Sequence, residues 1–346
     1  MALELGLDTF GDIALGPDGE PLTAATVVRE VLAEGQLADR LGLDFFGIGE
    51  HHRPDYAVSA PDTLLAGLAT TTEQIRLGSS VTVLSSDDPI RVFQRFSTVD
   101  AMSNGRAEIT VGRGSFIESF PLFGLALEDY EVLFSEKLDL LASVLEEQPF
   151  RWEGTVRPPV ESGPVMPPTE SGRLPTWVGV GGTPASVVRA AQYGLPIVIA
   201  IIGGASAQFA PLADLYRRAC TEYGHEGLPI SVHSPGHLAP TDEQAQEEYL
   251  PHFIEQMRKI GRERGWAPMT EEAARAQLSP EGAVYCGSPE TVARKIVATT
   301  RVLGATRFQF KYSNGHLPHD LRMSSIRLFG EEVAPRVREL LATDDA

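Results

Sequence analysis

The sequence predicts one α/β domain, a (β/α)8 TIM barrel with insertions, that spans residues 1–346. Three observations lead to this prediction. The length of 346 residues is large for an average domain but ordinary for an α/β barrel. Apolar strand-like runs alternate with amphipathic helix-like segments along most of the chain. Proline begins several of the expected helices and glycine ends several others.

Four strand–helix units are expected in the first half of the chain. Val27 and Val31 show the helical spacing, and Val and Thr enrich the third strand. The expected strands are Leu3–Asp8, Asp44–Gly49, Ile75–Leu84 and Arg106–Val111. The helices that follow them are Thr23–Leu41, Pro61–Thr71, Pro89–Ser103 and Tyr130–Glu147.

The second half repeats the pattern with two interruptions. Its expected strands are Thr176–Val180, Pro196–Ile202, Ile230–Ser234 and Arg307–Tyr312. Its expected helices are Pro184–Tyr193, Phe209–Tyr223, Asp242–Arg264, Pro289–Leu303 and Asp320–Val333. Loop insertions are expected near 149–175, which is rich in proline and glycine, and near 266–288. In a barrel, both insertions can cover the catalytic face, because long loops in compact domains are usually functional.

A closed barrel fits the alternation because parallel strands joined by helices have right-handed connections with the helices outside. The rival is an open, doubly wound sheet that binds a dinucleotide. The first strand–helix turn, Gly6–Gly19, lacks the GxGxxG pattern of that fold.

The composition excludes several partners. The formal net charge is -18, which opposes binding to nucleic-acid backbones and anionic membranes. Cys220 and Cys286 form no CxxC pair. The first residues lack the basic and apolar regions of a signal peptide, and the longest apolar run, Pro196–Ile202, is far shorter than a membrane span. We therefore expect a cytoplasmic protein without nucleic-acid or membrane partners.

The first candidate site is Glu50-His51-His52, directly after the second expected strand. Active sites of barrels form at this end of the strands, and histidine can transfer protons near neutral pH. An ordinary surface pair of histidines is the alternative. A metal site is not expected, because neighbouring residues of a strand point to opposite faces and no further ligand completes the set.

Two glycine-containing segments lie within the third expected strand and at the end of the fourth. Gly78-Ser79-Ser80-Val81 consists of small residues that allow a flat ring to approach the backbone, although close packing alone also explains them. In Val111-Gly112-Arg113-Gly114, Arg113 offers a planar set of donors to a phosphate. Phe116, Phe120 and Phe123 follow, and they either line an apolar pocket or pack locally.

The turn from Gly179 to Ser186 joins the fifth strand to a helix. A helix N-terminus presents free N–H groups to an anion, and the hydroxyls of Thr183 and Ser186 can add donors. The turn lacks the lysine of a P-loop, which argues against a nucleotide triphosphatase. Ordinary N-capping by Thr183 is the alternative reading. His316 and His319, after the eighth strand, receive no role.

Taken in order, these segments resemble the bacterial luciferase-like family of flavin-dependent monooxygenases. The resemblance covers nearly the whole chain, and the ordered set is more specific than any one motif. The matching segments are LADRLGLDFFGIGEHH (Leu37–His52), IRLGSSVTVLSSDDPIRV (Ile75–Val92), MSNGRAEITVGRG (Met102–Gly114), VGVGGTPASVVRAAQYGLP (Val178–Pro196), GSPETVARKI (Gly287–Ile296) and LFGEEVAPRVRE (Leu328–Glu339).

The resemblance implies roles for particular residues. His51 matches the catalytic histidine and Glu50 a carboxylate of the flavin pocket. Ser80-Val81 matches a pair joined by a non-prolyl cis peptide against the flavin ring, and Arg113 matches an arginine that contacts the phosphate. The phosphate-binding turn is matched by Gly181, Gly182, Thr183 and Ser186. Two departures stand out: luciferase has a carboxylate where Gly182 stands, and its second phosphate arginine has no counterpart around Leu127–Tyr130.

The family implies a two-component monooxygenase, usually dimeric. A separate NAD(P)H:flavin reductase supplies reduced FMN, oxygen adds to it as a flavin peroxide, and the peroxide oxidises a small organic substrate while His51 protonates or stabilises it. The alternatives are an F420-dependent oxidoreductase that transfers hydride, and a flavin-binding protein without turnover. A barrel lyase acting on sugar phosphates is disfavoured, with Lys311 as its one candidate for a Schiff base.

Overall fold

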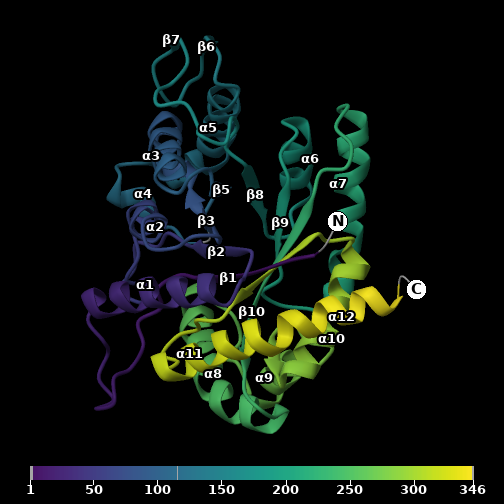
Figure 1. The fold of residues 1–346 in the computed structure, drawn as a ribbon. Helices are drawn as coiled ribbons and strands as arrows, with labels where there is room; N and C mark the ends of the chain where they lie inside the picture. The colour runs from purple at the N-terminus through teal and green to yellow at the C-terminus, as the bar shows by residue number, and fades with distance from the viewer. Residues whose placement is uncertain (1–2, 115, 345–346) are drawn as a thin grey trace.

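The computed structural model describes residues 3–114 and 116–344. Within them, eight parallel strands close into a barrel with helices outside, which confirms the predicted (β/α)8 fold (Figure 1). The barrel closes where the first strand pairs with the last, with Leu7 opposite Phe310. In barrel order the strands are β1 (Glu4–Thr9), β2 (Phe45–Ile48), β3 (Arg76–Ser79), β5 (Ala107–Gly112), β8 (Thr176–Val180), β9 (Ile197–Ala200), β10 (Ile230–Leu238) and β12 (Arg307–Lys311).

Side-chain caps mark the beginnings of two of the helices. Thr23 caps the first helix by accepting a hydrogen bond from the Thr26 amide, and Asp88 caps the third in the same way through Ile90 and Arg91. The long helices between the strands are α1 (Ala24–Arg40), α2 (Pro61–Ala69), α3 (Pro89–Met102), α5 (Tyr130–Leu145), α6 (Pro184–Gln192), α7 (Ala210–Glu222), α8 (Asp242–Arg264), α10 (Pro289–Leu303) and α11 (His319–Leu328).

Shorter elements refine the predicted boundaries. The third strand is interrupted, because Ser80 and Val81 lie between β3 and β4 (Thr82–Val83). The last predicted helix is α11 followed by a π-helical turn, Phe329–Val333, and α12 (Ala334–Asp344) continues beyond its predicted end. The remaining short elements are the 3-10 turns Leu84–Ser86, Leu127–Asp129 and Ser206–Phe209, the helix α4 (Ser119–Leu122), the strands β6 (Phe150–Trp152) and β7 (Val160–Ser162), the helix α9 (Glu271–Leu278) and the strand β11 (Tyr285–Gly287).

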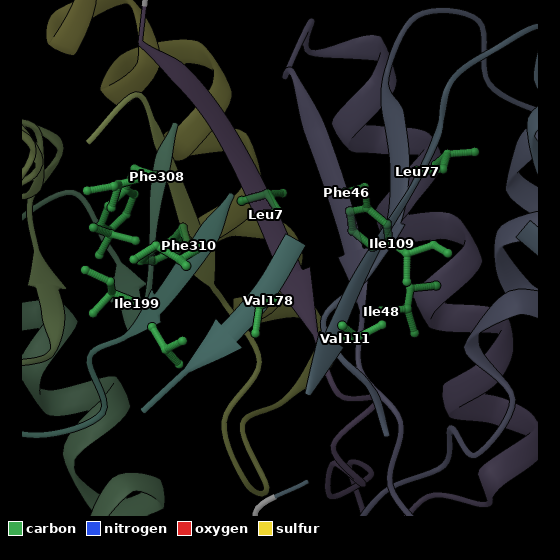
Figure 2. Close-up of a cluster of buried hydrophobic side chains, with 14 of the residues drawn as sticks. Leu7, Phe46, Ile48, Leu77, Ile109, Val111, Val178, Ile199, Phe308 and Phe310 are labelled. Atoms are coloured by element: carbon green, nitrogen blue, oxygen red, sulfur yellow. The ribbon is translucent and has the colours of Figure 1, made fainter. Parts of the chain in front are cut away.

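The hydrophobic core lies between the strands and the helices. Figure 2 shows buried apolar side chains on neighbouring strands, among them Leu7, Phe46 and Val178. Since side chains alternate along a strand, the residues between these apolar ones face the inside of the barrel. Asp8 and Gly47 are two such residues, and both are buried. The barrel interior is therefore more polar than the layer around it.

No described residue of the segment 149–175 lines the cavity at the carboxyl ends of the strands, so the expectation that it covers the catalytic face gains no support. It carries an antiparallel hairpin of β6 and β7, which projects beside α5 in Figure 1. Its later part is fastened near the amino ends of the strands, where the Ser171 amide donates to Asp100 at the end of α3, 2.9 Å away. Elsewhere in the segment, Arg157 pairs with Asp88 at the beginning of α3, 3.0 Å away, so the segment also reaches toward the carboxyl side.

The segment 266–288 is also more than a loop, because it contains α9 and β11. It belongs to the long excursion that begins after β10 and includes α8, so it starts from the carboxyl side of the barrel. Near the end of α8, Glu263 accepts a hydrogen bond from Arg53 at 2.7 Å, which ties this helix to the loop after β2. No helix within 3–114 and 116–344 has both the length and the apolar character needed to cross a membrane.

Candidate active site

A cavity of about 310 Å³ lies at the carboxyl ends of the barrel strands. Side chains and backbone from seven different strands or strand ends reach it, as is usual for barrel active sites. Gly182 and Thr183 are exposed and do not line the cavity. The predicted site residues that line it are Glu50, His51, Ser80, Val81, Arg113, Gly181 and Ser186.

The imidazole of His51 packs against three aromatic rings. Its imidazole stacks on Tyr56 with a centroid distance of 4.2 Å and meets the rings of Phe10 and Phe116 edge-on at 4.7 and 5.3 Å. Burial lowers the pKa of His51 to about 3, against the opposing effect of Asp12. The ring is therefore neutral at neutral pH. It can donate one hydrogen bond from a ring N–H but does not act there as an imidazolium.

Glu50 holds the segment after β3 in place. Its Oε2 accepts a hydrogen bond from the Val83 amide at 2.8 Å, and its own amide donates to the Val81 carbonyl at 3.1 Å. Its Oε1 lies 2.7 Å from Nε2 of His52, a partner that the sequence did not identify. Both carboxylate oxygens are thus engaged with the protein.

The peptide bond between Ser80 and Val81 is cis, as the family resemblance implies. Val81 packs into space left by glycines: a Cβ on Gly112 would lie 2.8 Å from Val81, and one on Gly179 would lie 3.1 Å from it. Ser80 Oγ donates to Asp8 and lies 3.4 Å from it. These residues form a small-residue wall of the cavity.

Arg113 pairs with Glu131 at the beginning of α5, and its guanidinium lies over the Tyr130 ring, 5.1 Å from the centroid. Arg189 of α6 donates to the other oxygen of Glu131 at 3.2 Å. A second arginine therefore stands beside Arg113, although the sequence analysis found none. A usable signal existed, because Arg189 follows Ser186 by three residues and so shares its face of the helix.

The beginning of α6 differs from an ordinary capped helix. The side chain of Thr183 makes no capping hydrogen bond, which removes support for that reading. Gly182 has a φ of 118°, a conformation that favours glycine. Ser186 is buried against the cavity.

A third histidine, absent from the predicted set, lines the cavity together with His51 and His52. His233 lies near the carboxyl end of the barrel-forming part of β10, and its Nδ1 is 2.6 Å from Oδ2 of the fully buried Asp8 on β1. Its ring is nearly parallel to that of Phe10, with centroids 5.9 Å apart. The sequence signal was the position of both residues near the ends of predicted strands.

Of the other predicted aromatic and basic residues, some line the cavity and others pack elsewhere. Phe116 lines the cavity, Phe120 packs against Tyr130, and Phe123 meets the edge of His52. Lys311 is not among the cavity residues: its Nζ contacts Asp12 at 3.2 Å and donates to the Ser313 carbonyl. Lys311 thus gives no support to Schiff-base chemistry. Among the residues that the structure describes, no group of three or more His, Cys, Asp or Glu side chains could hold a metal ion.

Comparison with known sequences adds two relatives. An uncharacterized protein, y4vJ, of Sinorhizobium fredii is 24% identical over 339 residues, which cover 94% of this chain and 95% of the relative. The N-acetyl-S-alkylcysteine monooxygenase of Bacillus subtilis is 29% identical over 245 residues, 68% of each chain.

Solved structures share the fold along almost the whole chain. The monooxygenase RslO1 of Streptomyces bottropensis has a TM-score of 0.81 at 22% identity, and the match covers 96% of this chain and 99% of that one. The oxygenating constituent of 3,6-diketocamphane monooxygenase of Pseudomonas putida, solved with FMN, has a TM-score of 0.77 at 19% identity, covering 97% and 99%. The F420-dependent tetrahydromethanopterin reductase of Methanopyrus kandleri has a TM-score of 0.72 at 16% identity, covering 97% and 100%.

The model of the luciferase-like monooxygenase family matches residues 9–307, which include every residue that lines the cavity. The chain belongs to the luciferase-like monooxygenase family.

Proposed function

We propose that this enzyme is a two-component monooxygenase that takes reduced FMN from a separate NAD(P)H:flavin reductase and uses oxygen to oxidise a small organic substrate. The observation that carries the proposal is one cavity lined by the cis Ser80–Val81 pair, His51, Arg113 and Ser186. Pockets of about 300–1,000 Å³ with an apolar lining and a few convergent polar groups are typical of cofactor sites.

The residues present fit a flavin. The wall made by Ser80 and Val81 next to Gly112 and Gly179 suits a flat ring system. Arg113 and the buried hydroxyl of Ser186 suit a phosphate, since arginine and the first turn of a helix both bind anions. Glu131 fills the space between the arginines in this structure and must turn away for Arg113 to reach a phosphate.

A bound reduced flavin supplies the activation of oxygen, and the protein supplies position, hydrogen bonds and the exclusion of water. His51 contributes a neutral ring N–H in a dry aromatic box, so it stabilises developing negative charge by hydrogen bonding. Glu50 keeps the segment around Val83 in place. Val198, Ala200 and Ile202 line the cavity and favour a substrate with an apolar body.

The first test measures binding and oxygen transfer separately. The purified protein is titrated with oxidised FMN, with anaerobically reduced FMN and with F420, and cofactor fluorescence or absorbance is followed. It is then coupled to a flavin reductase with NADH and a panel of small apolar molecules under isotopically labelled oxygen. The proposal predicts preference for reduced FMN and one labelled oxygen atom in the product.

Other outcomes identify the alternatives. Selective binding of F420 with oxygen-independent turnover indicates hydride transfer, the chemistry that the names of two structural neighbours describe. Tight binding of flavin without consumption of NADH or oxygen indicates a binding protein. A homodimer and a cytoplasmic location remain predictions, and sedimentation of the pure protein tests the first.

His51→Gln tests the catalytic assignment. Replacing the ring N–H by a differently placed amide donor is expected to lower turnover by about 10²- to 10³-fold, the usual effect of losing one positioned donor to developing negative charge, with flavin affinity retained. His225→Gln is the matched control, because His225 lies between α7 and β10 and does not line the cavity. Equal loss of turnover in both variants, or none in His51→Gln, contradicts the assignment.

A further inference from the structure

We infer that His233, oriented by Asp8, is a second catalytic residue of the cavity, which accepts the proton of a substrate hydroxyl. The inference rests on the proposed function and deepens it, because it identifies the substrate class as an apolar molecule that carries an O–H group, such as a phenol. It comes from the geometry of the dyad formed by Asp8 and His233.

The hydrogen bonds fix the state of the imidazole. Asp8 is fully buried, and its Oδ1 has no hydrogen-bond partner among the described residues. The short hydrogen bond of the Asp8 carboxylate is the one between its Oδ2 and Nδ1 of His233, at 2.6 Å. The other contact, with Ser80 Oγ, is longer, at 3.4 Å. A carboxylate is an acceptor, so Nδ1 carries the proton and donates it to Asp8.

In the neutral ring of His233 with its proton on Nδ1, the other nitrogen, Nε2, is an acceptor. The His233 ring lines the cavity, and Nε2 has no hydrogen-bond partner within residues 3–114 and 116–344. A neutral imidazole with its proton on Nδ1 offers a lone pair at Nε2. A ligand in the cavity that brings an O–H or N–H donor to this nitrogen satisfies it, whereas a hydrocarbon leaves a polar atom without a partner.

The proton transfer balances in charge. The substrate O–H bond breaks and leaves its electron pair on oxygen, while a new N–H bond forms at Nε2. The imidazolium that results lies against the Asp8 carboxylate, which stabilises it as a buried carboxylate does in a catalytic triad. The substrate oxygen becomes an anion and makes its ring more electron-rich, which prepares it for oxidation.

His233 and His51 play different parts. They contact the Phe10 ring differently, because the His233 ring is nearly parallel to it and the His51 ring meets it edge-on. His51 packs against aromatic rings, whereas His233 contacts a buried carboxylate. The charged group on the remaining neighbouring strand is Lys311 of β12, whose Nζ lies 4.6 Å from the Phe10 centroid and is paired with Asp12. The cavity thus contains one neutral donor and one acceptor backed by a counter-charge.

A pair of chromophoric probes tests the inference. 4-Nitrophenol carries the O–H and turns yellow when it ionises, and 4-nitroanisole has the same body without the O–H. Equilibrium binding to the full-length protein, with and without FMN, is expected to favour 4-nitrophenol by about 2- to 12-fold, the value of one hydrogen bond. Its spectrum when bound at a pH below its own pKa is expected to show the ionised form.

His233→Gln and Asp8→Asn are the test variants, and His225→Gln is the matched control. Both test variants should lose the preference for 4-nitrophenol and the ionised spectrum, while binding of 4-nitroanisole stays within about twofold. Asp8 is buried and its variant can misfold, so circular dichroism is recorded for every variant, and His233→Gln alone decides if Asp8→Asn does not fold. The control should behave as the natural protein.

The inference fails if the natural protein does not prefer 4-nitrophenol, or if His233→Gln keeps the preference or the ionised spectrum. This outcome is independent of the proposed function, because the probes are measured without flavin as well. Failure to bind FMN with an intact probe preference overturns the flavin proposal and leaves the dyad standing. Normal FMN binding without any probe preference overturns the dyad alone.

Discussion

The two ends of the barrel interior use charged residues in opposite ways. At the amino end, the buried Arg307 pairs with Glu108 and Glu4, and its guanidinium lies between the rings of Phe45 and Trp177. At the carboxyl end, the side chain of His233 has one ring nitrogen engaged and the other free of a described partner. The amino end satisfies its charges internally, and the carboxyl end keeps polar atoms available to a ligand.

The end of the barrel that contains the candidate active site does not have the larger cavity. The amino-end cavity has a volume of about 640 Å³, larger than the 310 Å³ of the carboxyl-end cavity. It is lined by charged groups that pair with one another, such as Glu4 with Arg76 and Arg307. The comparison teaches that free hydrogen-bonding capacity at strand ends, rather than volume, identifies the functional end of this barrel.

The largest expected effect comes from breaking the amino-end ion pair. Arg307→Met leaves Glu108 buried without its partner, so we expect a loss of about 3–5 kcal/mol in the free energy of unfolding, measured by urea denaturation. Arg151→Met breaks the exposed pair with Glu161 and should cost at most about 1 kcal/mol.

A double variant makes this test sharper. Arg307→Met combined with Glu108→Leu removes both charges and should recover much of the lost stability, because replacing a whole buried pair by apolar side chains is often neutral or stabilising. If the single variant is as stable as the natural protein, the amino end does not have the structural role described for it.

Acid should affect the carboxyl end through His51. The pKa of His51 is lowered from 6.5 to about 3 in the folded protein, so the unfolded chain binds a proton at this residue at a higher pH than the folded one. The contribution of His51 to the free energy of unfolding is therefore fully present above pH 6.5 and is lost as the pH drops toward 3. Urea denaturation across this range should show a shallower loss for His51→Gln than for the natural protein. Parallel curves would contradict the shift.

The smallest expected effect concerns the arginine pair. Glu131→Gln removes the carboxylate that Arg113 and Arg189 share, and an exposed ion pair contributes at most about 1 kcal/mol, so FMN affinity should rise by up to about fivefold. Riboflavin lacks the phosphate, and its affinity should not change. A matching gain for riboflavin would show that Glu131 acts on something other than the phosphate.

Most of the fold could be predicted because hydrophobic periodicity and helix ends are local properties of the sequence. The strand Thr176–Val180 was predicted with its observed boundaries, and the cis peptide at Ser80–Val81 followed from the family resemblance. The hairpin of β6 and β7 was missed because its strands are three residues each, too short for a period to appear.

The site was predicted in part for a similar reason. Glu50 and His51 stand together in the sequence and were found, whereas Asp8 and His233 are 225 residues apart and meet only when the barrel closes. Glu131 shows the same limit, since nothing local to α5 indicates that it lies between arginines from β5 and α6.

The pairing of the first strand with the last has a consequence for synthesis on the ribosome. Glu4 and Arg307 are joined by a hydrogen bond across 303 residues, so β1 must wait for its partner while the intervening chain is translated, on the order of tens of seconds. Throughout that time the edge of β1 that pairs with β12 is unpaired. The nascent barrel thus stays open until β12 has been made.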